Sequence, residues 1–544
     1  MLTRLTGGEV VDPVNGATGI RDIWIRDGVI VDPREGEAAD QTHDVSGCII
    51  MAGAIDIHSH IGGGNVNTAR LLLPEHHKAH LPRPAATPLS NAGWSTFQTG
   101  CLYAQMGFTT VVEPAMAPYT ALHTHLELAD IPIIDRATLA ILGNDDFTLS
   151  LLRDGKSEAM IDDYVAWVVG STRALGVKVI NAGAAAAFKE NVRAFSFDDE
   201  VPEYGLSSRK IVKSMQHSVT RLGIPHPLHV HANNLGLAGS ADTADVTIAA
   251  TEGVPMHLAH LQFYGYGTQG KRAFSSEAAR LAESVNSNPN VTIDVGQVMF
   301  GQTVTISSDV MRQFSAIDKA SPKKSVIIDG DGNGGGGIVP YSYKRNYYGT
   351  LQWAVGLELF LLIANPWQVF FTTDHPNGAP FTAYPEIFEL LMSSEARDAR
   401  AVELNVAALE MTTLASIRRE YSLEEIAIMT RASPAKLLGL KDRGHLGAGA
   451  IADIAVYRRG KDIAKMFREA ALVFKNGQLV VKNGKVSAYR WGKTLRLNPP
   501  PDRAMVKRMK AYHEDRYGLP LEWFTFPDSA IDRDEPFMEV PWNS

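Results

Sequence analysis

The amino-acid sequence predicts an α/β fold: a (β/α)8-type barrel with a small composite β-sandwich domain formed by both chain ends. Three observations support this prediction. The 544 residues suggest one large catalytic domain plus something smaller. The middle of the chain alternates between helical periods and short apolar runs, which is typical of parallel strands joined by helices. Both ends instead contain short strand-like runs separated by turn residues.

The elements follow in chain order. Residues 1–50 contain "IWIRDGVIVDP" and similar runs, and form the first part of the composite β domain. Residues 51–440 form the barrel, where runs such as "QMGFTTVVEP" and "GVKVINAG" end in polar residues, as expected for buried parallel strands that open into loops. Residues 441–495 supply the second part of the β domain. Their Asn-Gly pairs at 476–477 and 483–484 predict two hairpins.

Two further segments need separate interpretation. The run "GLELFLLIANPWQVFFTT" (356–373) is interrupted by polar residues, so it predicts a buried helix followed by a strand and not a membrane span. Residues 496–544 are rich in proline and aromatic residues and lack a long period. We expect this tail either to pack on the chain's own barrel or to contact another subunit.

Composition narrows the function classes. Lys+Arg 52 against Asp+Glu 60 gives a net charge of −8 that is spread along the chain, which argues against nucleic-acid binding. Only two cysteines are present, so a disulfide framework is not expected and a reducing, cytoplasmic location is the simplest one. The N-terminal residues also lack an apolar core of signal-peptide length.

The stretch "AIDIHSHIGGG" (54–64) raises the question of a metal site, because His58 and His60 lie two residues apart and can reach one ion. Alone, such a pair is weak evidence, since two polar residues can simply close a strand. Other residues of ligand type also fall at or near predicted strand ends, where barrel active sites form. These residues are Lys178, His229, His231, His257, His260 and Asp374.

This order of residues resembles the amidohydrolase superfamily, which includes dihydropyrimidinases and dihydroorotases. "AIDIHSH" resembles its opening motif, "VHANN" and "AHLQ" its two later histidine strands, and "TTDHPNGAPF" its aspartate strand. Longer stretches, including "DIHSHIGGGNVNTARLLLPEHH" and "HLAHLQFYGYG", resemble the A-subunit family of formylmethanofuran dehydrogenases and bacterial formyltransferase/hydrolase complexes. The resemblance extends over most of residues 1–490.

The resemblance implies an amidohydrolase barrel with two zinc ions. Such ions supply a nucleophile at neutral pH and polarise a carbonyl, and zinc suits imidazole and carboxylate ligands. His58 and His60 would hold one ion, and His231 and His260 the other. Carbamylated Lys178 would serve as an anionic ligand with two oxygens. Asp374 would bind one ion and act first as general base and then as general acid.

Other residues are weaker candidates. The resemblance makes Asn65, Asn67 and Arg70, just after the histidine pair, plausible coenzyme contacts. Asn233 and Asn234 would orient a ligand or the neighbouring histidine. His229 and His257 are more often packing or supporting residues, and His375 could assist the leaving group or serve a structural role.

One glycine-rich motif resembles a calcium-binding loop but does not meet the requirements of one. "DGDGNGGGG" (329–337) mimics the start of a calcium-binding loop, but Pro340 occupies the twelfth position, where a glutamate is required. The stretch also lacks the Lys and Ser/Thr of a phosphate-binding loop. We expect a glycine-rich loop near the barrel mouth that acts as a lid or accepts a bulky substrate arm.

The resemblance predicts a hydrolase that cleaves the N-formyl group of a methylofuran- or methanofuran-type coenzyme to formate and the free amine coenzyme. It further implies that the chain works with other subunits of a formyltransferase/hydrolase or dehydrogenase complex in one-carbon metabolism. Two alternatives remain open. The chain could be a cyclic-amide hydrolase or aminoacylase on the same scaffold, or a non-catalytic scaffold protein of the complex.

Overall fold

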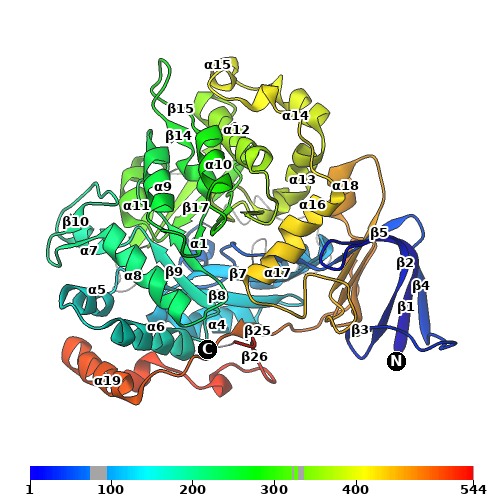
Figure 1. The fold of residues 1–544 in the computed structure, drawn as a ribbon, viewed down its shortest axis with the longest axis horizontal. Coiled ribbons are helices and arrows are strands. Elements are labelled where there is room, and N and C mark those ends of the chain that lie inside the picture. The colour runs from blue at the N-terminus through cyan, green and yellow to red at the C-terminus, as the bar shows by residue number, and fades with distance from the viewer. Residues whose placement is uncertain (74–94, 321–323, 329–335, 543–544) are drawn as a thin grey trace.

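The computed structural model describes residues 1–73, 95–320, 324–328 and 336–542 and is built around a curled parallel sheet (Figure 1). Its eight barrel strands neighbour one another in chain order, which confirms the predicted fold class. They are β6 (Ala54–Asp56), β7 (Phe108–Met116), β8 (Asp135–Leu142), β9 (Gly176–Ile180), β12 (Leu228–His231), β13 (Met256–Leu258), β16 (Val291–Asp294) and β20 (Val369–Phe370).

Contacts just beyond the first and last strands close the barrel. Ser59 and His375 form a parallel bridge, and the His60 amide donates to the His375 carbonyl at 2.8 Å. The Thr372 hydroxyl donates to the carbonyl of His58. The segments that carry the predicted ligands of strands β6 and β20 are therefore fixed side by side.

Helices cover the outside of the barrel. Helix α6 is an example, since its apolar side chains Ile161, Tyr164, Val165 and Val168 recur at helical spacing and are buried. The run at 356–373 forms the end of α12 and then β20, as predicted. Helices between barrel strands and after β20 include α3 (Thr96–Gln105), α4 (Ala121–Ala129), α5 (Asp146–Arg153), α6 (Glu158–Thr172), α8 (Ser208–Arg221), α9 (Ser240–Ala249), α10 (Ala278–Asn286), α12 (Tyr347–Leu362), α13 (Tyr384–Met392) and α14 (Ser394–Ala401). No helix in the described ranges is both long and apolar enough to span a bilayer.

Both chain ends contribute to one nine-stranded sheet beside the barrel, at the right of Figure 1. The two halves meet where Cys48–Ala52 pairs antiparallel with Ile454–Arg458. Both predicted Asn-Gly hairpins are confirmed: Asn476, Gly477, Asn483 and Gly484 all have positive φ, as a type I′ turn requires. The strands are β1 (Leu2–Asp12), β2 (Ala17–Arg26), β3 (Val29–Val31), β4 (Gln41–Asp44), β5 (Cys48–Ala52), β21 (Ile454–Arg458), β22 (Leu472–Lys475), β23 (Gln478–Lys482) and β24 (Lys485–Val486).

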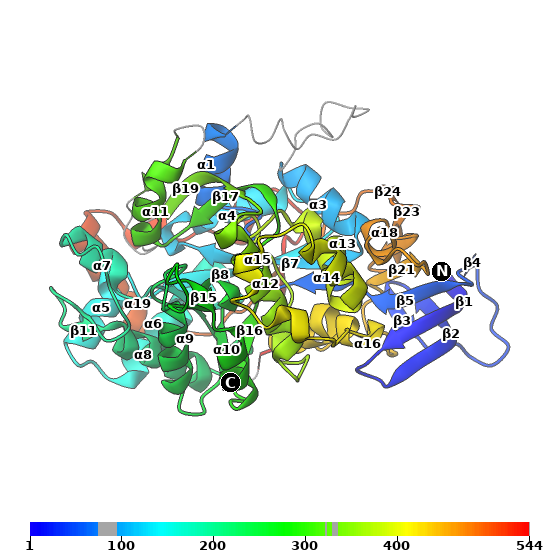
Figure 2. The ribbon, with the colours of Figure 1, turned by 90° about the horizontal axis from the view of Figure 1, so that it is seen from above.

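An excursion between β16 and α12 forms a separate three-stranded antiparallel sheet. It consists of β17 (Gly301–Ser307), β18 (Val326–Ile328) and β19 (Gly336–Tyr343), with helix α11 (Val310–Ala316) between β17 and β18. Val304, Ile306 and Ile338 pack against helix α1 (Gly64–Leu72), and Figure 2 shows these elements grouped together. The glycine-rich loop predicted from "DGDGNGGGG" lies outside the described residues, apart from its last two glycines, which begin β19.

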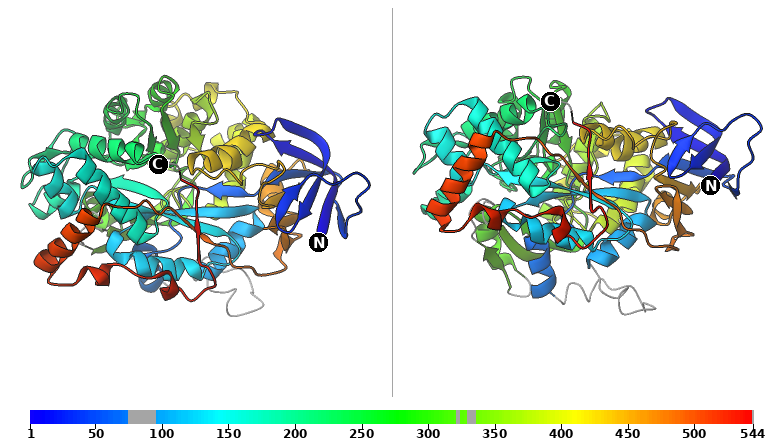
Figure 3. Two further views of the ribbon diagram at one scale, coloured as in Figure 1. Left: turned by 60° about the horizontal axis from the view of Figure 1, so that its bottom comes forward. Right: turned by 90° about the horizontal axis from the view of Figure 1, so that it is seen from below.

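The tail lies along the underside of the barrel (Figure 3). Strand β25 (Thr494–Arg496) pairs with β8, and β26 (Phe537–Glu539) pairs with β25, so the tail extends the barrel sheet. We expected the tail to have no regular spacing of apolar residues, and this expectation is wrong for α19 (Arg503–Tyr517). The buried residues of this helix, Met505, Met509 and His513, recur every four positions. The spacing was present in the sequence, but most neighbouring residues are polar and hide it.

Candidate metal centre

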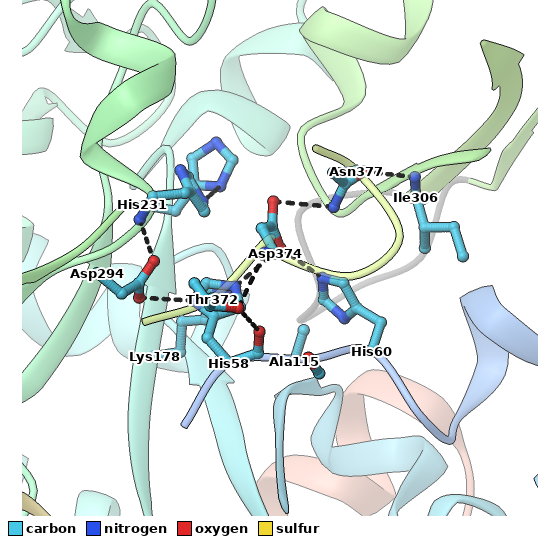
Figure 4. Close-up of polar contacts among 12 residues, drawn as sticks. His58, His60, Ala115, Lys178, His231, Asp294, Ile306, Thr372, Asp374 and Asn377 are labelled. Atoms are coloured by element: carbon cyan, nitrogen blue, oxygen red, sulfur yellow. Dashed lines mark hydrogen bonds and ion pairs between the residues drawn. The ribbon is translucent and has the colours of Figure 1, made fainter. Parts of the chain in front are cut away.

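His58 and His60 converge on one carboxylate oxygen. The Nε2 atom of His58 lies 3.0 Å from Oδ1 of Asp374, and Nε2 of His60 lies 3.5 Å from the same oxygen. Asp56, at the end of β6, fixes the start of this segment by accepting hydrogen bonds from the His58 amide at 3.0 Å and the Ser59 hydroxyl at 2.7 Å. The predicted pair and the predicted aspartate therefore meet, as Figure 4 shows.

The other nitrogen of each imidazole is held by an acidic side chain. Nδ1 of His58 lies 2.9 Å from Asp294, and Nδ1 of His60 lies 2.9 Å from Glu113. Burial alone would lower the pKa of His60, but Glu113 and Asp374 raise it to about 9. The raised pKa shows that these carboxylates favour positive charge at His60, and such surroundings also favour a bound cation.

Asp374 is oriented from both sides. Asn377 donates from Nδ2 to Oδ2 of Asp374 at 3.0 Å, and the Asp374 amide donates to the Thr372 hydroxyl at 2.9 Å. Burial alone would raise the pKa of Asp374, but the His58 and His60 imidazoles outweigh burial and hold this pKa well below its usual value. The carboxylate is therefore ionised, with Oδ1 turned toward the histidines.

Lys178 lies in β9 and lines the same cavity as His60 and Asp374. Its Nζ atom lies 3.4 Å from Nε2 of His58, and its side chain is almost fully buried. Throughout the described ranges no carboxylate lies within ion-pair distance of Lys178. Burial accordingly lowers the pKa of its amine.

His231 and His260 form a second imidazole pair. Nε2 of His260 lies 3.1 Å from Nδ1 of His231, and Nδ1 of His260 has no hydrogen-bond partner in the described part of the chain. Burial lowers the pKa of both imidazoles, so both are neutral and carry lone pairs. His260 is held in place because its amide donates to Asp294 at 2.6 Å.

These donors fit divalent metal ions. His231 and His260 are neutral and Asp374 is ionised, which are the protonation states that metal binding requires, and a bound cation would displace the proton that the raised pKa of His60 favours. Candidate ligand atoms of His58, His60 and Asp374 lie within 4.8 Å of one another, and so do those of His58, His229 and Asp294. Buried imidazole nitrogens that face one another lack enough hydrogen-bond partners, and a bound metal ion would provide the missing interaction.

Sequence reasoning missed Glu113, Asp294 and Asn377. Asp294 ends β16 and so follows the pattern of polar residues at strand ends that identified the histidines, whereas Glu113 lies within β7, three residues before its end. Asn377 stands three residues after Asp374, within the motif "TTDHPNGAPF". The signal was present for Asp294 and Asn377, but acidic and amide side chains at strand ends are less distinctive than paired histidines.

His229, His257 and His375 lie close to the centre in supporting positions. Nε2 of His229 lies 3.0 Å from Nδ1 of His58, and Nε2 of His257 lies 3.0 Å from Asp294. His375 accepts a hydrogen bond from the Phe381 amide at 3.2 Å. The first two therefore extend the polar network beneath the His58 imidazole.

The five predicted coenzyme contacts do not line the cavity at the centre. Arg70 forms an ion pair with Glu127 and donates to the Ile61 carbonyl at 2.9 Å, which ties down the segment after the histidine pair. Asn233 accepts from the Ser208 hydroxyl at 3.0 Å, and Asn234 donates to the Thr243 hydroxyl at 2.9 Å. Asn65 and Asn67 lie in α1, where Asn67 is exposed.

The cavity has a polar floor and a more varied outer wall. Its floor is formed by His60, Lys178, His231, His260 and Asp374. Phe263, Leu235 and the excursion residues Tyr341 and Tyr343 form an aromatic and apolar side. The remaining lining residues are Ala115, Ile180, Gly236, Thr305, Ile306, Ser307, Ser308, Arg312, Gln352 and Asn377.

Known proteins share this architecture and sequence. The chain is 51% identical over 537 residues to the A subunit of the formyltransferase/hydrolase complex Fhc of Methylorubrum extorquens, covering 98% of this chain and 97% of that protein. It is 38% identical over 490 residues to "Protein FwdA" of Methanocaldococcus jannaschii, covering 86% of this chain and 85% of that protein.

A solved structure and a family model agree with these relatives. The crystal structure of the formyltransferase/hydrolase complex FhcABCD from Methylorubrum extorquens, in complex with methylofuran, contains a chain that matches with a TM-score of 0.97 and 50% identity over 100% of both chains. The model of the amidohydrolase family matches residues 41–488. The chain belongs to the amidohydrolase family.

Proposed function

We propose that this chain is the hydrolytic component of a formyltransferase/hydrolase complex. It cleaves the N-formyl group of a methylofuran-type coenzyme to formate and the free amine coenzyme. The observation that carries this proposal is the convergence of His58, His60 and Asp374 on one point of a buried cavity, in a chain so similar to the Methylorubrum Fhc protein. A non-catalytic scaffold would need no such convergence of costly buried polar groups.

We assign two zinc ions to the centre. His58 and His60 would hold one, His231 and His260 the other, and Asp374 would contribute a carboxylate oxygen. Bound zinc would lower the pKa of water and polarise the formyl carbonyl. The donor set supports zinc because imidazole and carboxylate ligands suit it.

We assign a carbamate to Lys178. Its amine is buried and has no acidic partner within the described residues, so as an ammonium it would add positive charge where cations are to be bound. Reaction of the neutral amine with carbon dioxide forms a nitrogen–carbon bond, releases one proton and leaves an anion with two oxygens. The position of Lys178, 3.4 Å from the His58 imidazole, supports this role.

Asp374 would transfer the proton during hydrolysis. Its Oδ1 atom would accept a proton from the attacking water as the water oxygen bonds to the formyl carbon. When the carbon–nitrogen bond breaks, the same carboxyl group would deliver that proton to the leaving amine nitrogen. Asn377 would keep Oδ2 occupied, so that Oδ1 remains the atom that faces the reaction.

The outer cavity suits a flat ring attached to the formamide. Phe263, Tyr341 and Tyr343 offer an aromatic wall next to the polar floor, and aromatic pairs favour such contact. Asn65 and Asn67 would contact the coenzyme farther from the floor. Arg70 and the pair Asn233–Asn234 would act by fixing the segments that follow β6 and β12.

We also propose a division of the chain by role. Residues 51–440 form the catalytic domain, and residues 1–50 and 441–495 form one supporting β domain through the shared sheet. Residues 496–544 form the tail, whose described part, up to residue 542, packs under the barrel. Trp523 in this tail has 72% of its surface exposed, which suits contact with a partner chain of the complex.

The test combines composition and activity. The complex should be purified without chelators and analysed by native mass spectrometry for bound coenzyme and by elemental analysis for zinc. Formate release from the formyl coenzyme should then be measured, with hydantoins, dihydropyrimidines and N-acyl amino acids as alternative substrates. Formate release together with close to two zinc ions per chain is expected. Turnover of only the alternative substrates would refute the proposal.

A further inference from the structure

Arg312 is a cation in the cavity with no acidic partner among the described residues. It lies in α11, is only partly exposed and lines the same cavity as Lys178 and Asp374. Its backbone amide donates to Asp309 at 3.0 Å, but within the described part of the chain its guanidinium makes no ion pair or hydrogen bond. By contrast, Arg70 pairs with Glu127 at the edge of the site, and Arg345 pairs with Glu403 outside the cavity.

The surroundings of Arg312 leave the guanidinium available. It lies against Gly236, where an added Cβ would be 3.4 Å from the Cζ atom of Arg312. Gly236 has a φ of +73° and also lines the cavity, so the guanidinium rests on bare backbone. No other side chain in the described segments holds it by a polar contact.

Tyr341 offers a second unused donor on the same wall. Its hydroxyl makes no hydrogen bond with any described residue, and its ring lies 4.8 Å from that of Tyr343. Burial raises the pKa of Tyr343 well above its usual value, Tyr341 adds to the rise and Arg312 opposes it. Both groups are therefore close to Tyr343, and both belong to the excursion, while the metal donors belong to barrel strands and the segments that follow them.

We propose that Arg312, assisted by the hydroxyl of Tyr341, binds a carboxylate at the outer wall of the cavity. A guanidinium presents paired N–H donors that match the two oxygens of a carboxylate, and a partly desolvated cation gains most from such a partner. The inference rests on the proposed function, whose product formate is one such carboxylate. A carboxylate carried by the coenzyme itself is the alternative source, and the test distinguishes the two.

Arg312→Gln, Arg312→Lys and Tyr341→Phe should be compared with Arg345→Gln, a matched control that removes a guanidinium outside the cavity. The assembled complex of each variant should be tested for KM and kcat with the formyl coenzyme and for inhibition by sodium formate. Binding of sodium formate and of free coenzyme should also be followed by calorimetry. Zinc content and Tm of each variant serve as checks on folding.

Arg312→Gln should weaken binding of the carboxylate partner by about tenfold or more, Arg312→Lys by less, and Tyr341→Phe by least. Weaker formate inhibition with an unchanged KM identifies formate as the partner. A raised KM and weaker coenzyme binding, with unchanged formate inhibition, identifies the coenzyme carboxylate.

Unchanged formate and coenzyme binding in Arg312→Gln, or equal losses in Arg345→Gln, would overturn the inference. Failure of the proposed function looks different, because the wild-type complex would then release no formate from the formyl coenzyme. The calorimetric comparison of formate binding would still test Arg312 in that case.

Discussion

The floor and the outer wall of the same cavity are built from different kinds of structure. The floor residues Lys178, His231 and Asp374 stand on barrel strands or directly after them. Much of the wall, including Arg312 and Tyr341, comes from the excursion between β16 and α12. The positions of the floor residues are therefore set by the barrel strands. The wall residues of the excursion lie outside the barrel, so they can vary without disturbing it. We expect floor changes to affect metal content and kcat, and wall changes to affect KM.

Lys178→Ala tests the floor most severely. Removing the proposed anionic ligand should release zinc and reduce formate release by more than the roughly 10²–10⁴-fold that general-base catalysis supplies. Small carboxylic acids such as acetate should restore part of the activity, because they can replace the carbamate. Lys210→Ala, at an exposed position of α8, is the control. Retained zinc and activity in Lys178→Ala would contradict the assignment.

Asp374→Asn separates proton transfer from metal binding. The amide keeps the shape of the side chain but cannot accept the proton, so kcat should fall by roughly 10²–10⁴-fold. Zinc, measured by elemental analysis, should change much less because the four histidines and Lys178 remain. Near-normal hydrolysis in Asp374→Asn, with loss of activity in His375→Ala or His257→Ala instead, would show that another residue is the base.

Asn377→Ala tests the connection between floor and wall. Nδ2 of Asn377 donates to Asp374 at 3.0 Å, and Oδ1 accepts from the Ile306 amide of β17 at 2.7 Å. The variant loses both hydrogen bonds, and loss of the one to the charged carboxylate should reduce kcat by about tenfold, with little change in zinc content. A rise in KM alone would instead assign Asn377 to the wall.

Trp523→Ser should have the smallest effect on activity, because Trp523 belongs to the tail and to neither the floor nor the wall of the cavity. If the exposed ring contacts a partner chain, its loss should weaken assembly of the complex by about fivefold, measured by mass photometry during dilution. Formate release by the assembled complex should be unchanged. Unaltered assembly would indicate that the tail contributes only to packing under the barrel.

The same contrast explains what the sequence could predict. His58, His60 and Asp374 could be placed together because period-two strands and a barrel topology leave little freedom at strand ends. The two Asn-Gly hairpins were predictable for a similar local reason. These features depend on short-range patterns and on one global topology.

The wall could not be predicted in this way. Strands β17 and β19 pair antiparallel with each other and not with the barrel, and the position of α11 depends on that pairing. Arg312 was not recognised as a candidate ligand-binding residue because its lack of an acidic neighbour among the described residues can be seen only in three dimensions. The coenzyme contacts that the sequence predicted in α1 and after β12 likewise depended on distances that no sequence spacing encodes.

The sheet shared by both chain ends has a consequence for synthesis on the ribosome. Cys48–Ala52 emerges early, but its partner Ile454–Arg458 is made only after the entire barrel. At about 5–20 residues per second, this interval is on the order of tens of seconds. During that time Ile49, Ile50 and Met51, all buried in the finished protein, have one sheet edge without its final neighbour. The nascent chain therefore has an apolar strand edge that must be kept from other chains until translation is nearly complete.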